Sequence, residues 1–273
     1  MKNKLLALTF TTSISIGATV HADKTPVEWV NPFIGTGAVA NSLSGNNYPG
    51  ATVPFGMVQL SPDTRVAPDW AQASGYDYND RQIIGFSHTR LSGTGASDFI
   101  DILLMPTTGK TCIEAQESPR SGTGYQSAFS HDRESASPGY YKVTLDSYGI
   151  DVELTASARV GMHRYRYPQG ADSSHIVLDL DHSANKGSWG RRIINQIRIV
   201  DPCTVDGYRI ITGWAKLRKI YFRIRFSQPI RNVLLADGSR IYHNMPVING
   251  TALKAVFDFD TRHNTTVMAK VAL

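Results

Sequence analysis

The residues best suited to chemistry gather in two clusters in the first third of the chain. The first cluster combines acids, a base and an indole ring, at Asp63, Arg65, Asp69 and Trp70. Such a set is typical of sugar recognition, because an aspartate and an arginine hold neighbouring hydroxyls while the ring stacks on the C–H face of the sugar. We therefore predict that these four side chains contact a substrate.

The second cluster consists of His88 and Arg90, which lie on one side of the chain if their segment is extended. A histidine at such a place either bonds sugar hydroxyls and orients a neighbouring group, or ties loops together as a structural residue. Both interpretations stay open, and we include His88 and Arg90 among the predicted substrate-binding residues.

Catalytic carboxylates are harder to find. Glycoside hydrolysis requires two carboxylates that flank the scissile bond, with room for a water between them if the configuration inverts. Asp98 and Asp101 lie three residues apart around Phe99, where turn capping explains them as well as catalysis does. A self-sufficient glycosidase would have to draw its pair from Asp98, Asp101 and the two aspartates of the first cluster.

A long loop-rich segment carries these residues. Residues 46–106 are dense in glycine, proline, aromatic and short polar residues, with a short strand expected at 57–60 that ends at the run 61–65. Loops this long are usually a built surface, so the segment is interpreted as a ligand-facing wall, with well-packed loops as the alternative.

Strands dominate the remainder of the chain. Apolar residues alternate with polar ones over 141–145, 150–154, 220–226, 257–260 and 267–271, which indicates strands with one buried face. Turn dipeptides at 138–139, 206–207, 237–238 and 249–250 predict hairpins between them. No amphipathic helix of ten residues stands out. The expected fold is a large all-β antiparallel sandwich with long irregular loops.

Several long strings resemble one known family, the amino-terminal domain of glycoside hydrolase family 92. They are VNPFIGTG (30–37), YPGATVPFGMVQLSPDT (48–64), GFSHTRLSGTG (85–95), DILLMPTTG (101–109), ESASPGYYKVTL (134–145), GIDVELTASARVGMHRYRYP (149–168), GYRIITGWA (207–215) and IYFRIRFSQPI (220–230). The resemblance covers nearly all of the chain after residue 26. Two departures are Arg90, where the family commonly has a histidine, and a loop without histidine between Gly37 and Tyr48.

The resemblance implies a sugar-epimerase-like sandwich over residues 23–273 and a role in a calcium-dependent, inverting exo-α-mannosidase acting on N-glycans or mannans. In that family the general acid, the general base and most calcium ligands lie in a helical (α/α)6 domain that follows the sandwich. We therefore expect this chain to lack the catalytic domain, to be inactive alone, to bind no cofactor itself and to have that helical domain as its partner. A freestanding carbohydrate-binding module is the alternative.

The first 22 residues predict a secretory signal, with Lys2 and Lys4 before an apolar stretch and a small-residue cleavage site at 20–22. The mature chain would be periplasmic or extracellular, and no later apolar run predicts a membrane span. Cleavage leaves 26 basic against 23 acidic residues, a net charge of +3 that is too small to predict a nucleic-acid partner. Cys112 and Cys203 either pair or remain separate buried thiols.

Overall fold

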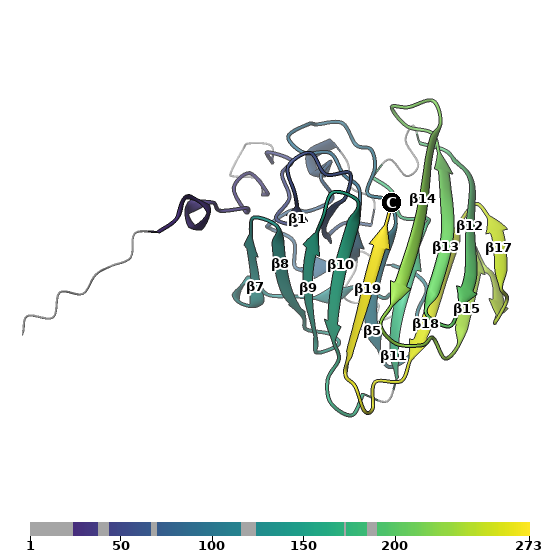
Figure 1. The fold of residues 1–273 in the computed structure, drawn as a ribbon. Helices are drawn as coiled ribbons and strands as arrows, with labels where there is room; N and C mark the ends of the chain where they lie inside the picture. The colour runs from purple at the N-terminus through teal and green to yellow at the C-terminus, as the bar shows by residue number, and fades with distance from the viewer. Residues whose placement is uncertain (1–23, 38–43, 67–69, 116–123, 172, 185–189) are drawn as a thin grey trace, which may run out of the picture.

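The computed structural model describes residues 24–37, 44–66, 70–115, 124–171, 173–184 and 190–273. Two large antiparallel sheets face each other across the core (Figure 1). The first has eight strands, in the order β1 (Ala51–Thr52), β2 (Gln59–Asp63), β4 (Gly85–Ser87), β5 (Leu103–Thr108), β11 (Ser174–Asp179), β18 (Leu253–Phe259), β15 (Val233–Asp237) and β16 (Arg240–His243).

The second sheet has nine strands, in the order β17 (Val247–Gly250), β12 (Arg192–Asp201), β13 (Thr204–Ile211), β14 (Arg218–Phe226), β19 (Thr266–Ala272), β10 (Val160–Arg166), β9 (Ile150–Ala156), β8 (Tyr140–Leu145) and β7 (Glu134–Ser137). A separate pair is formed by β3 (Gln82–Ile83) and β6 (Ser127–Ala128). Helical structure in the described residues is limited to the short 3-10 helices η1 (Pro26–Trp29), η2 (Trp70–Gln72) and η3 (His131–Arg133).

The predicted all-β sandwich is confirmed, because the period-two pattern directs one face of each strand into the core. In β14, Phe222, Ile224 and Phe226 are buried while Tyr221 is 62% exposed. The strands expected from alternation at 141–145, 150–154 and 267–271 correspond to β8, β9 and β19. Local patterning was sufficient here because the buried face is set by side chains two residues apart.

The expected end of a strand at residue 61 is wrong. Strand β2 continues through Pro62 to Asp63 and pairs with β4, with Pro62 opposite Phe86. On its other side, β1 reaches only as far as Leu60, so Pro62 has a neighbouring strand on one side alone. A proline is tolerated there because its missing N–H removes no ladder bond on the open side.

Two of the four predicted hairpin turns are confirmed and two are wrong. Gly139 and Gly238 have positive φ and connect β7 to β8 and β15 to β16. Gly207 instead lies inside β13, where an added Cβ would be 2.4 Å from the Phe222 ring, so a glycine is needed for close packing. Gly250 ends β17, and the next strand, β18, belongs to the other sheet.

Cys112 and Cys203 do not pair with each other, and both are half-buried. No described helix is long and apolar enough to cross a membrane. The predicted signal at residues 1–22 lies outside the described residues.

Candidate functional site

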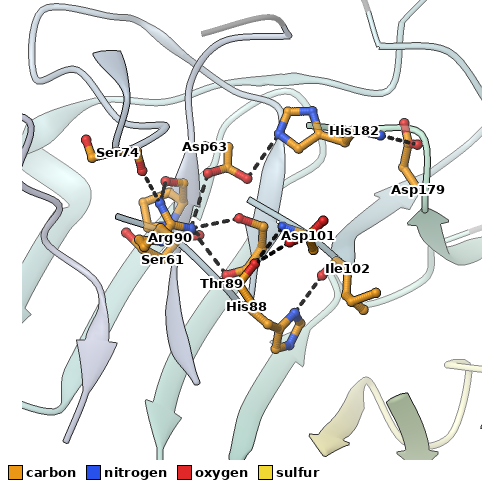
Figure 2. A network of polar contacts seen from close by, with 12 residues as sticks. Ser61, Asp63, Ser74, His88, Thr89, Arg90, Asp101, Ile102, Asp179 and His182 are labelled. Carbon is orange, nitrogen blue, oxygen red and sulfur yellow. Dashed lines mark hydrogen bonds and ion pairs between the residues drawn. The ribbon is translucent and has the colours of Figure 1, made fainter. Parts of the chain in front are cut away.

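The ends of strands β2, β4 and β5 bring three of the six predicted site residues, Asp63, His88 and Arg90, into one region with Asp101. Asp63 is the last residue of β2, His88 and Arg90 follow β4 directly, and Asp101 lies two residues before β5. Figure 2 shows these side chains in one network that also includes His182, from the segment after β11. Asp69 lies outside the described residues.

Arg90 is the centre of this network. Its side chain is fully buried, and its guanidinium donates to the backbone carbonyls of Gln59 (3.1 Å), Ser61 (2.8 Å), Ser74 (2.6 Å) and Ser87 (3.2 Å). These carbonyls belong to β2, β4 and the loop before β3, so one side chain ties three segments together (Figure 2). Arg90 therefore holds together the base of the loop-rich segment 46–106, which we call the loop wall. Its buried side chain has no surface left for a ligand.

Asp63 balances the charge of Arg90. Its carboxylate is fully buried, with Oδ1 3.2 Å from Arg90 Nη2 and Oδ2 3.2 Å from His182 Nε2. These contacts lie at ion-pair distance without hydrogen-bond alignment, so the attraction is mainly electrostatic. Gly75, at a φ of +88°, passes so close that an added Cβ would be 2.4 Å from Asp63 Oδ1. Only glycine suits both the backbone angle and the space.

His88 begins a buried chain of hydrogen bonds that crosses to the second sheet. Its Nδ1 lies 2.6 Å from the carbonyl of Ile102, its Nε2 lies 2.9 Å from His163 Nε2, and His163 Nδ1 lies 2.7 Å from the hydroxyl of Tyr165. A carbonyl only accepts, so His88 Nδ1 donates to it. With both rings neutral, His163 Nε2 then donates to His88 Nε2, and Tyr165 donates to His163 Nδ1.

Burial keeps both of these histidines neutral. Desolvation lowers the pKa of His88 to about 4, and it lowers the pKa of His163 well below its usual value, with His88 as a further cause. Each ring is 0% exposed. His88 thus fastens the loop to the core of the sandwich, and its position favours the structural role among the two that the sequence left open.

The aspartate–arginine pairing expected within the first cluster does not form between Asp63 and Arg65. Arg65 instead makes two bonds of 2.7 Å to the carboxylate of Asp80, which also accepts from Thr64 Oγ1 at 2.7 Å. Arg65 is 39% exposed, so part of its guanidinium side faces solvent. Asp80 is a functional candidate that the sequence offered no signal to single out.

Trp70 is the predicted residue that the structure places at the surface, with 61% of it exposed. It opens η2, and its carbonyl accepts from Asn46 Nδ2 at 3.2 Å, which anchors the backbone beneath the ring. Phe55 also projects fully from the adjoining loop system. Sugar contact by Trp70 stays a prediction, and its exposure is what ring stacking requires.

The two aspartates considered as a catalytic pair both form ion pairs with arginines. Asp98 Oδ1 lies 2.7 Å from Arg218 Nη1, while Asp101 lies 3.1 Å from Arg218 Nη2 and 2.9 Å from Arg209 Nη1. Both carboxylates are fully buried. They are therefore structural anchors in this chain, since a general acid or base must reach a substrate and exchange a proton.

The backbone at residues 99–102 is strained. Phe99, Ile100 and Ile102 have φ values of 69°, 56° and 59°, in the left-handed region that β-branched residues rarely adopt. Such angles persist only where the surrounding contacts fix them. Here the fixing contacts include the carbonyl of Thr89, which accepts from the Ile100 N–H at 2.8 Å, and the guanidinium of Arg218, which lies 4.2 Å over the ring of Phe99.

Sequence reasoning missed three residues of this region: His182, Arg209 and Arg218. The run 216–219 indicated a solvated face, which is wrong for Arg218 because its side chain is only 10% exposed. Arg209 is fully buried in β13, and burial lowers its pKa. The one available signal was Arg209, which lies on the otherwise apolar face of a strand. Because buried charges are rarely tolerated without a partner, its position predicts a buried acidic partner.

No metal site is apparent in the described part of the chain. No group of three or more histidine, cysteine, aspartate or glutamate side chains in it is arranged to hold an ion.

Comparison with known proteins identifies the family of this sandwich. The family model for the glycosyl hydrolase family 92 N-terminal domain matches residues 29–273. The chain therefore belongs to glycoside hydrolase family 92, as its amino-terminal domain.

Solved relatives agree with this assignment. A family 92 α-mannosidase from Bacteroides thetaiotaomicron is 35% identical to this chain, with a TM-score of 0.83. The match covers 92% of this chain and 33% of the mannosidase. The same enzyme in complex with mannoimidazole gives 36% identity over 90% of this chain, 32% of its own length and a TM-score of 0.81. The chain thus spans about a third of the length of these enzymes.

A more distant relative is an uncharacterized secreted glycosidase from Arthroderma benhamiae. It is 25% identical over 161 residues, which are 56% of this chain and 20% of that protein.

Proposed function

We propose that this chain is the carbohydrate-facing domain of a calcium-dependent, inverting exo-α-mannosidase that acts on α-mannosides of N-glycans or mannans. A helical domain would supply the general acid, the general base and the calcium ligands. Family membership and the two mannosidase structures support the proposal. We further propose that the protein is exported to the periplasm or the extracellular space.

The observation that carries the proposal is a contrast within the loop wall: some of its aromatic rings are exposed, whereas three of its carboxylates are buried in ion pairs with basic side chains. Trp70 offers an exposed ring at the surface, while Asp63, Asp98 and Asp101 are buried in ion pairs. Such a wall is equipped to hold a sugar but not to protonate its leaving group.

Exposed apolar residues elsewhere on the loops support a helical partner. Phe55, Met57, Trp214 and Leu217 are all at least half exposed. Monomeric proteins seldom expose large contiguous apolar patches, and such residues are typical of surfaces that a second domain covers.

Hydrolysis tests the catalytic half of the proposal. The purified chain should not cleave 4-nitrophenyl α-mannoside or α-1,2-mannobiose, with or without calcium, because Asp63, Asp98 and Asp101 are each buried in an ion pair. A complete family 92 α-mannosidase serves as the positive control. Turnover that disappears in Asp98→Asn or Asp101→Asn would instead establish a self-sufficient glycosidase.

Binding tests the other half. Mannose should perturb the tryptophan fluorescence of the chain weakly, and Trp70→Ala should abolish the response, because stacking on one ring is worth about 1 kcal/mol. Trp29→Ala is the matched control, since Trp29 is also exposed, at 71% against 61% for Trp70, but lies in η1. A response that survives in Trp70→Ala would remove Trp70 from the site. Tight mannose binding by the chain alone would favour a freestanding binding module.

A further inference from the structure

The outer face of the nine-stranded sheet carries a row of neutral side chains across four neighbouring strands, on the side of Figure 1 where β17, β12, β13 and β14 lie. In register, Asn249 of β17 faces Gln196 of β12, Gln196 faces Tyr208 of β13, and Tyr208 faces Tyr221 of β14. The row spans three strand spacings, roughly 14 Å.

The members of this neutral row are oriented by one another. Gln196 Nε2 donates to Asn249 Oδ1 at 2.9 Å, and the ring centroids of Tyr208 and Tyr221 lie 6.1 Å apart at 60°. Tyr221 is 62% exposed, and Tyr208 and Gln196 are half-buried. The row therefore presents two aromatic rings beside amide groups whose positions are already restricted.

A charged row lies next to it. Asp206 of β13 accepts from Arg198 at 2.7 Å and from Arg223 at 2.6 and 2.8 Å, and these bonds lower the pKa of Asp206, with the bond from Arg223 as the main cause. The charged row and three members of the neutral row, Gln196, Tyr208 and Tyr221, line a surface hollow of about 380 Å3. Arg198, Asp206 and Arg223 already hold one another in place. A ligand that covers them therefore loses less conformational entropy on binding than one that must order mobile side chains.

The other half of the same outer face lacks this arrangement. There the arginines of β10 pair with acids of β9, as Arg164 does with Glu153 and Arg166 with Asp151. Its tyrosine, Tyr140, donates to Glu153 and so belongs to a charged pair. The row of amides and aromatic rings is thus a local feature of four strands and not the general character of the sheet.

We propose that this hollow is a second saccharide site, which binds an uncharged glycan chain laid along the row from Gln196 to Tyr221. The rings of Tyr208 and Tyr221 supply stacking surfaces for the C–H faces of sugars, and the amides supply in-plane donors and acceptors for hydroxyls. The net charge of the two rows is only +1, from two arginines and one aspartate, so a neutral chain suits them better than a polyanion. The site is separate from the loop wall and does not depend on the mannosidase proposal.

The test uses the full chain carrying Trp70→Ala, which suppresses any binding at the loop wall. Saturation-transfer NMR titrations with α-1,6-mannopentaose and cellopentaose should detect binding of at least one of them. Tyr208→Thr should weaken that binding about tenfold, the factor that corresponds to the upper range of aromatic stacking. Threonine favours strands, so the substitution removes the ring and preserves the sheet.

Tyr140→Thr is the matched control, a tyrosine on the same outer face whose loss should leave the affinity unchanged. Tyr208→Phe should retain binding, because the ring remains. Absence of binding by both pentasaccharides would overturn the proposal, and so would equal affinities in the Tyr208→Thr and Tyr140→Thr variants. Circular dichroism of each variant verifies that the fold is kept.

Discussion

Replacing Arg90 with leucine should lower the free energy of unfolding by about 3–5 kcal/mol, the cost of leaving one partner of a buried ion pair without the other. The substitution would strand Asp63 in a fully buried position and would remove the donor from four backbone carbonyls. Urea denaturation followed by tryptophan fluorescence measures the change.

Arg164→Leu provides the matched control. Arg164 also pairs with a carboxylate, Glu153, but its side chain is 46% exposed, and surface pairs contribute at most about 1 kcal/mol. Arg90→Lys should fall between the two, because a single ammonium group cannot reach the carbonyls that the planar guanidinium spans. If Arg90→Leu costs no more than Arg164→Leu, the buried network does not hold the loops.

Acidification from pH 7 to about 4 should destabilise the protein by about 3 kcal/mol through His88 alone, with His163 adding to the loss. Burial lowers the pKa of His88 from 6.5 to about 4. Between these values the unfolded chain binds a proton that the folded chain excludes, so stability falls as the pH decreases and levels off below the folded pKa. The loss should begin near pH 6.5.

Two measurements check this expectation. The double variant His88→Gln/His163→Gln should show a smaller change in the urea midpoint between pH 7 and 4.5, while His243→Gln, at an exposed histidine, should resemble the parent chain. Independently, the ring nitrogen shifts of His88 and His163 should remain those of neutral imidazoles at pH 5. Protonated rings at that pH in the folded protein would contradict the assignment.

The features that the sequence predicted correctly are local. The alternation in 220–226 and the turns at Gly139 and Gly238 depend on residues within a few positions of each other, and each formed as expected. Gly207 misled because an aspartate–glycine pair signals a turn, whereas its real constraint is the Phe222 ring on the neighbouring strand. That constraint exists only once the two strands are paired.

The candidate site shows the same difference between local features, which the sequence predicted, and long-range contacts, which it did not. The sequence indicated that Asp63, His88 and Arg90 belong to one special region, and the structure places all three in the network beneath the loop wall. Their partners came from far along the chain. His163 lies 75 residues after His88, and Arg218 lies 120 residues after Asp98. No local spacing rule relates such pairs. Only the folded molecule therefore shows which carboxylates form ion pairs with arginines.

The strained turn at 99–102 has a consequence for the order of folding. Its aspartates, Asp98 and Asp101, pair with Arg218 and Arg209, which enter the chain more than a hundred residues later. During synthesis from the amino terminus, the turn can form its local bonds to His88 and Thr89, but the arginines that hold its carboxylates arrive only with β13 and β14. Because contacts of such long range form slowly, the loop wall should be among the last parts of the domain to become ordered.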